Sequence, residues 1–184
     1  QTPAKTDAAK TNTAKLAQKD RPRIQMAILL DTSNSMDGLI NQARTQIWKI
    51  VNEFAKASQQ GKQPVLEVAL FEYGNSGLNA EQGYLRKVVD LTDNLDRISE
   101  ELFALSTRGG QEYCGWVIAE ATRQLAWSKS DDDFKCIYIA GNEPFTQGKV
   151  NPDEACQKAI EAGIIVNTIH CGSYHVGVQT GWKR

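Results

Sequence analysis

A nearly continuous apolar run at residues 24–30 is the feature that most limits how this chain can fold. Half-buried strands alternate apolar and polar residues, whereas an uninterrupted run is typical of a strand buried on both faces of a parallel sheet. The run stops at a polar loop, residues 31–37, and an amphipathic helical pattern follows. Its apolar residues share one face at the helical period: Ile40, Ala43, Ile47, Ile50, Val51 and Phe54. This order predicts the first unit of an α/β domain.

Strands and helices continue to alternate along the chain. The pattern predicts further strands at residues 65–71, 85–91, 136–140 and 164–169. The second of these is expected at an edge of the sheet. Helical patterns separate the later strands: one carries Leu95 and Leu102, one carries Ile118 and Leu125, and Pro152 opens the last. The alternation predicts an α/β fold with a doubly wound, mostly parallel sheet of about five strands and helices on both faces.

Length and composition narrow the class of protein. The 184 residues are enough for one domain with a substantial core. A formal net charge of -1 provides no field that would favour nucleic acid as a partner. No apolar run approaches the roughly 20 residues that span a bilayer, so we predict no membrane span. The chain has only two histidines, no phosphate-binding glycine motif and no nucleophile elbow, and we therefore predict that it is not an enzyme.

The chain divides into three predicted segments. Residues 1–22 are expected to be a flexible tether, because Leu16 is the only large apolar residue in the first twenty. Residues 23–172 form the predicted domain. Residues 173–184 have no helical face and are expected to be an exit loop, as if a longer domain had been clipped. The chain begins at Gln1 rather than Met, so we expect a processed or trimmed chain, and the tether favours an extracytoplasmic location.

The loop after the first strand carries oxygen-bearing side chains at alternate positions, Asp31, Ser33 and Ser35. In an extended turn these oxygens can point the same way. One carboxylate and two hydroxyls suit Mg²⁺, Ca²⁺ or Mn²⁺ and do not suit a thiophilic metal. We expect this loop to lie at the surface, so that replacing Asp31 would leave the fold intact. The alternative is that Ser35 or Asp37 caps the following helix.

Residues 26–54, which include the run DTSNSM at residues 31–36, resemble the start of a von Willebrand factor A (VWA) domain. The resemblance runs from about Arg23 to Gly172. The runs GNEPF at residues 141–145 and NTIHCG at residues 167–172 are similar to an uncharacterised bacterial branch of exported members. The resemblance implies a Rossmann-like fold, here without the family's last strand and closing helix. It also implies that the loop opens a metal-ion-dependent adhesion site (MIDAS).

Two positions depart from the family's metal motif. The family's second loop supplies a Thr after two glycines, whereas here the two glycines precede Gln111 and Glu112. Its third loop supplies an Asp, whereas this chain has Asn142, whose amide oxygen can coordinate with one negative charge fewer. Glu112 or Glu143 would restore that charge. The resemblance therefore implies a metal site made of Asp31, Ser33, Ser35, Glu112 and Asn142.

Two functions follow from this resemblance. In the first, the domain is a metal-dependent protein-binding or adhesion module, whose Mg²⁺ (or Ca²⁺ or Mn²⁺) takes a carboxylate from a protein partner. In the second, it is a metal-independent structural or scaffolding VWA domain with a degenerate MIDAS. The altered second and third loops leave both open.

The four cysteines do not form a C-x-x-C pair, so a zinc ribbon is not expected. Cys136 lies inside an apolar strand and is predicted to be a free, buried thiol. A disulfide among Cys114, Cys156 and Cys171 is compatible with the predicted topology, but the sequence does not select a pair.

Overall fold

The computed structural model describes residues 21–58, 61 and 63–183. Of the predicted tether, residues 1–22, all but the last two residues lie outside this part. The five strands are β1 (Arg23–Asp31), β2 (Val65–Tyr73), β3 (Leu85–Thr92), β4 (Phe134–Gly141) and β5 (Ile164–His170). They form one sheet in the order β3-β2-β1-β4-β5, in which only β3 runs antiparallel to its neighbour. The predicted doubly wound, mostly parallel sheet with an edge strand at 85–91 is confirmed.

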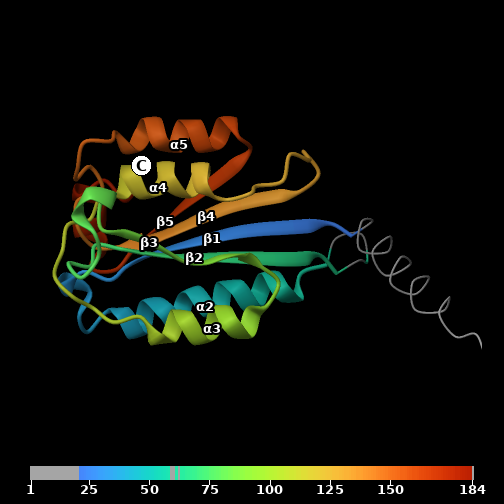
Figure 1. Cartoon of the computed structure of the whole chain (residues 1–184), viewed down its shortest axis with the longest axis horizontal. Coiled ribbons are helices and arrows are strands. Elements are labelled where there is room, and N and C mark those ends of the chain that lie inside the picture. The colour runs from blue at the N-terminus through green and yellow to red at the C-terminus, as the bar shows by residue number, and fades with distance from the viewer. Residues whose placement is uncertain (1–20, 59–60, 62, 184) are drawn as a thin grey trace, which may run out of the picture.

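Helices cover both faces of the sheet (Figure 1). They are α2 (Ile40–Lys56), α3 (Leu95–Ala104), α4 (Cys114–Gln124), α5 (Pro152–Glu161) and α6 (Tyr174–Gln179), with short 3-10 turns η1 (Asn34–Met36) and η2 (Ala80–Gln82). Figure 1 shows α2 and α3 on one face and α4 and α5 on the other. None of the helices in the described ranges is long and apolar enough to cross a bilayer.

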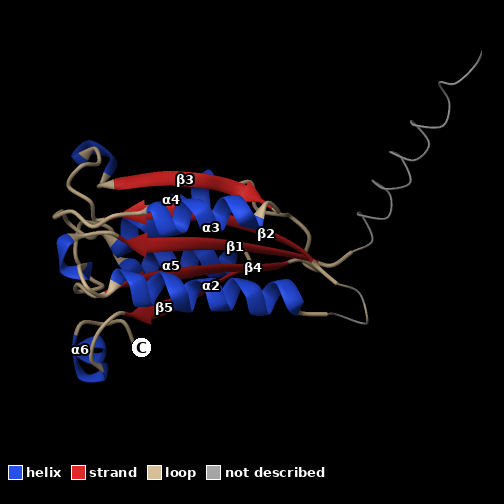
Figure 2. Ribbon diagram, turned by 90° about the horizontal axis from the view of Figure 1, so that it is seen from below, coloured by secondary structure: helices blue, strands red, loops and turns tan. Residues whose placement is uncertain are grey.

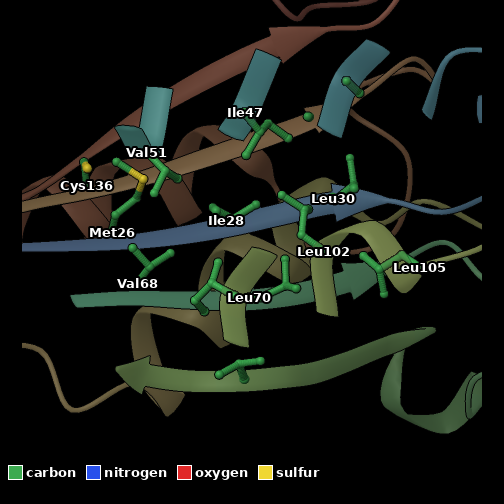
Figure 3. Close-up of a cluster of buried hydrophobic side chains, with 14 of the residues drawn as sticks. Met26, Ile28, Leu30, Ile47, Val51, Val68, Leu70, Leu102, Leu105 and Cys136 are labelled. Carbon is green, nitrogen blue, oxygen red and sulfur yellow. The ribbon is translucent and has the colours of Figure 1, made fainter. Parts of the chain in front are cut away.

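The central strand β1 explains why its sequence is apolar without alternation. Met26, Ile28 and Leu30 point into a core shared with α2 and α3 (Figure 3). Ala27 and Leu29 point the other way, into a core shared with α4 and α5. A strand with a core on each face has no solvent-facing side, so residues 26–30 are all apolar, and the buried amide of Gln25 is satisfied by hydrogen bonds with Glu67 and Ser128.

Arg44 is a charged residue on the buried side of α2, and its exposed fraction is 8%. Its guanidinium donates from Nη1 to the backbone oxygens of Phe103 (2.7 Å) and Leu105 (2.9 Å). These carbonyls belong to the end of α3, where the helix leaves acceptors without intrahelical partners. Arg44 therefore fixes the point at which the loop between α3 and α4 begins.

The prediction that residues 173–184 form an exit loop is wrong, because residues 174–179 form the short helix α6. Its first turn is capped by Ser173, whose hydroxyl accepts a hydrogen bond from the amide of Val176. A six-residue helix that contains glycine and valines has too few turns to display a periodic face. The segment then packs inward at Trp182, which is 3% exposed. The described residues contain no sixth strand.

All four cysteines are free thiols in this structure. Cys136 is buried in the core beneath α2, as predicted. Cys114 is buried at the start of α4, while Cys156 and Cys171 are partly buried. Burial raises the pKa of Cys136 to about 12 and that of Cys171 to about 11, so neither is poised to react as a thiolate near neutral pH.

Candidate metal centre

Asp31, at the carboxyl end of β1, is fully buried, so the expectation that its loop lies at the surface is wrong for this residue, although Asn34, Ser35 and Asp37 are exposed. Its neighbours Thr32 and Ser33 are also buried, because β2 and the loop before α4 cover this end of the sheet. The amide of Ser33 donates to Asp31 Oδ1 at 2.7 Å. Within the described ranges no hydrogen bond reaches Oδ2, although this atom is also buried. A buried carboxylate oxygen with no partner is costly, and such an atom is typical of a site that receives a cation.

Ser33 and Ser35 turn their hydroxyls toward each other, and their Oγ atoms are 2.9 Å apart. The alternative that Ser35 or Asp37 caps the next helix is wrong: the residue before α2 is Leu39, and neither η1 nor α2 has a side-chain cap. Ser33 is buried, whereas Ser35 is exposed. The loop therefore runs from a buried carboxylate to an exposed hydroxyl, a path from the core to solvent.

Asn142 follows β4 and joins the third loop to the first. Ser35 Oγ donates to Asn142 Oδ1 at 2.9 Å, and Asn142 Nδ2 donates to the backbone oxygen of Ser35 at 3.1 Å. The parallel pairing of β1 with β4 brings these loops to the same edge of the sheet. The amide oxygen of Asn142 thus lies beside the serine hydroxyls.

Glu112, just before α4, is 5% exposed and faces Asp31. A Cβ added at Gly74 would lie 2.8 Å from Asp31 Oδ1 and 3.0 Å from Glu112 Cγ, so both side chains line one small space. Gln111 is exposed and turns away, since its Oε1 accepts a hydrogen bond from the hydroxyl of Tyr113. Of the two residues that follow the glycines of the second loop, the structure brings only Glu112 into the site.

The site concentrates negative charge. Burial raises the pKa of Asp31 to about 6, with a further contribution from Glu143, while Ser33 and the nearby backbone N–H of Asn142 lower it less. Burial, followed by the charges of Asp31 and Glu143, raises the pKa of Glu112 to about 7. Both carboxyls therefore hold a proton more tightly than usual, and a cation would displace these protons.

The five predicted residues meet at this end of the sheet, and their donors are carboxylate, hydroxyl and amide oxygens. This set fits a hard divalent cation. No group of three or more His, Cys, Asp or Glu residues is placed to hold a metal anywhere in the described ranges, so a cation at this site would need hydroxyl and amide oxygens beside the two carboxylates. The unpartnered Oδ2 of Asp31 is the observation that favours the fit.

Sequence reasoning missed three contacts that shape the site. Gln147 accepts a hydrogen bond at Oε1 from the amide of Glu112 (2.6 Å), which ties the second loop to the third. The Tyr73 hydroxyl donates to the backbone oxygen of Ala140 at 3.1 Å, below the site. A Cβ at Gly141 would lie 2.6 Å from that hydroxyl, 3.0 Å from Asp31 Oδ2 and 3.0 Å from the ring of Trp182. The one sequence feature that could have indicated this close packing is Gly141, a glycine at the end of a strand.

An open α/β sheet with oxygen-rich loops beyond the carboxyl ends of its parallel strands defines a Rossmann-like binding domain. The family model for the von Willebrand factor type A domain matches residues 25–177, most of the chain. The chain belongs to this family. The match reaches into α6, beyond the predicted end of the domain at residue 172. A comparison with curated proteins found no match.

Solved structures with the same fold come from diverse proteins. Proximal thread matrix protein 1 from the mussel byssus superposes with a TM-score of 0.63 at 13% identity, over 82% of this chain and 36% of that one. The SpRpn10 VWA domain gives 0.62 at 15% identity, over 86% and 80%. The pilus adhesin SpaC from Lactobacillus rhamnosus GG, in its open conformation, gives 0.59 at 14% identity, over 81% and 24%. This chain spans about a third of the matrix protein and a quarter of the adhesin.

Proposed function

We propose that this chain is a metal-dependent protein-binding module that uses a MIDAS-like site. Asp31, Ser33 and Ser35 would hold a divalent cation (Mg²⁺, Ca²⁺ or Mn²⁺) from the first loop, with Glu112 and Asn142 from the second and third. When bound, the cation would supply a positive centre that accepts a carboxylate from a protein partner. The buried, unpartnered Oδ2 of Asp31 is the observation that carries this proposal.

The chain's own residues divide this work by their burial. Asp31 and Glu112 are buried and would supply the negative charge that retains a cation. Ser35 is exposed and Asn142 half-buried, so they form the rim through which a partner would approach. The two carboxylates would offset the two charges of the cation, so a partner's carboxylate would bind by filling an open coordination position at the neutral rim. The site would bind and not catalyse, and we propose no enzymatic activity for it.

A second function is favoured by the contacts that close the site without an ion. Ser35 and Asn142 exchange two hydrogen bonds, and Ser33 contacts Ser35 directly. In a metal-independent scaffolding domain these bonds would be the working state, and the loops would act only as a surface. The two functions differ in one measurable property, the response of the protein to divalent cations.

The setting of the domain is proposed from its neighbours. A byssus matrix protein and a pilus adhesin share this fold, and both names refer to structures outside the cell. We propose an extracytoplasmic role in adhesion for this chain, in a bacterial protein, as the resemblance of its 141–145 and 167–172 runs implies. The fold alone does not identify the partner.

Thermal melting tests the proposed function. After treatment with EDTA, adding Mg²⁺, Mn²⁺ or Ca²⁺ should raise the melting temperature, because a ligand that binds only the folded state stabilises it by mass action. At about a hundred times the dissociation constant the gain is about 2.7 kcal/mol, which for a domain of this size is on the order of 5–10 °C. An unchanged melting temperature at millimolar concentrations of all three ions would favour the scaffolding function.

Asn142→Asp should strengthen cation binding. The substitution adds a third carboxylate to the proposed ligands Asp31 and Glu112, so the metal-free protein should melt at a lower temperature and the cation should bind about tenfold more tightly or better. Isothermal titration of both proteins measures the change. Asn34→Asp adds the same charge at an exposed position of the first loop and should alter affinity far less. Equal effects of the two substitutions would place Asn142 outside the cation's coordination.

A further inference from the structure

Trp182, beyond the C-terminal end of α6, is a buried aromatic residue that the proposed site does not include. Its indole Nε1–H donates to the backbone oxygen of Glu143 at 2.6 Å. Glu143 directly follows the proposed ligand Asn142 in the third loop. The tip of the ring lies 3.0 Å from a Cβ placed at Gly141, the same distance as Asp31 Oδ2, so the ring reaches the wall of the site itself.

The third loop makes further contacts with this C-terminal segment. The amide of Phe145 donates to the backbone oxygen of Thr180 at 2.8 Å. The rings of Phe145 and Trp182 pack edge to face, with their centroids 4.9 Å apart and their planes at 69°. A backbone bond, an indole bond and an aromatic pair therefore join the third loop to one short segment of chain.

The segment is in turn anchored to the sheet. The hydroxyl of Thr168, on β5, donates to the backbone oxygen of Trp182 at 2.6 Å, and the amide of Trp182 donates to Gly177 in α6 at 2.9 Å. Figure 2 shows α6 at the end of the sheet where the loops after β1 and β4 lie. The segment thus bridges a rigid strand and the loop that carries Asn142.

We infer that Trp182 is a positioning residue for the candidate site, which holds the third loop so that Asn142 stays against Ser35. The third loop connects β4 to α5 without regular structure of its own, and its position must be fixed by contacts from outside. The third loop also contacts the second loop, since Gln147 Oε1 accepts a hydrogen bond from the backbone amide of Glu112. Trp182 therefore acts on both altered loops of the site, on Asn142 through the adjoining Glu143 and on Glu112 by way of Gln147.

Trp182→Phe tests this role, since it keeps an aromatic ring but removes both the N–H that binds Glu143 and the part of the indole that reaches Gly141. Trp127→Phe is the matched control. It removes a comparable indole bond, 3.1 Å to the backbone oxygen of Ala121, near the C-terminal end of α4 and away from the loop that carries Glu112. Hydrogen–deuterium exchange should be faster at residues 141–147 in Trp182→Phe than in Trp127→Phe. Affinity for Mn²⁺ should fall about tenfold in the first variant and be unchanged in the second.

The two readouts separate this inference from the proposed function, on which its metal readout rests. If the wild-type protein binds no cation, the proposed function fails and the exchange result alone decides the role of Trp182. Unchanged exchange at residues 141–147 in Trp182→Phe would overturn the inference. If the wild-type protein binds Mn²⁺, an unchanged Mn²⁺ affinity in Trp182→Phe would also overturn it. If Trp182→Phe does not fold, Thr168→Val takes its place, because it removes the hydrogen bond that anchors Trp182 to β5. Thr168→Val should show the same faster exchange and weaker Mn²⁺ binding, to a smaller extent. Unchanged exchange in this variant would overturn the inference.

Discussion

Asp31→Asn should stabilise the metal-free protein while abolishing its response to divalent cations. At neutral pH the wild-type carboxylate is charged, buried and only half satisfied, since Ser33 serves Oδ1 and Oδ2 has no partner in the described chain. Burial raises the pKa of Asp31 from 3.8 to about 6, so folding at pH 7 works against its ionisation. A shift of this size corresponds to about 2–3 kcal/mol, which the uncharged amide would recover. Most substitutions at a buried residue destabilise, so an increase is a specific signature.

The pH dependence of this difference has a defined sign. Because the pKa of Asp31 is higher in the folded protein than in the unfolded chain, the folded state binds the proton more tightly, and the carboxylate costs no stability below about pH 3.8. The cost grows as the pH rises from there to about 6 and is constant above. Urea denaturation of both proteins in EDTA should therefore give Asp31→Asn the larger free energy of unfolding at pH 7.5. The two free energies should converge as the pH falls toward 4. If Asp31→Asn is less stable than wild type at pH 7.5, Asp31 is a structural residue whose charge the fold needs.

Gly110→Ala should displace the second loop and weaken both the fold and the site. A Cβ at this position would lie 2.0 Å from the backbone oxygen of Gly74 and 2.9 Å from the backbone nitrogen of Ser76. These are backbone atoms of the loop that follows β2, and they cannot rotate away as a side chain can. Relief requires the second loop to move, at a cost of about 1–3 kcal/mol. Glu112, two residues further on, would move away from Asp31, so cation affinity should fall as well.

Gly109→Ala is the control for this substitution. A Cβ there would meet only the Cβ of Asn34, at 3.8 Å, which is an ordinary contact. Its stability should stay within about 0.5 kcal/mol of wild type and its cation affinity should not change. Urea denaturation and isothermal titration of both alanine variants make the comparison. Matching midpoints and affinities would mean that the two loops do not approach each other as closely as the structure has them.

The fold could be predicted because its signals are local and repeated. The apolar run of β1 and the helical face that includes Ile47 and Val51 are properties of neighbouring residues, and both cores form as these patterns require. The helix α6 could not be predicted for the same reason, since its six residues are too few for a helical period to appear in the sequence. Trp182 is isolated in the sequence, and its value comes from contacts with a loop about forty residues away.

The candidate site could be predicted only as a set of residue types. Alternate positions at 31, 33 and 35 indicated the first loop, but not that Asp31 would be buried, because burial there depends on β2 and on the loop before α4. Glu112 could be chosen over Gln111 only for its charge, since the position of the two residues after the glycines did not distinguish them. The structure separates them, because Tyr113 engages Gln111 while Glu112 turns inward. Ligand roles for these residues remain predictions.

Crystals grown with Mn²⁺ and measured at the manganese absorption edge test the central proposal most directly. The proposal predicts an anomalous difference peak bounded by Asp31, Ser33 and Ser35, with Asn142 and Glu112 contributing directly or through water, and no such peak in Asp31→Asn. Well-ordered crystals at millimolar Mn²⁺ in which Ser35 still bonds Asn142 and no peak stands beside Asp31 Oδ2 would contradict it.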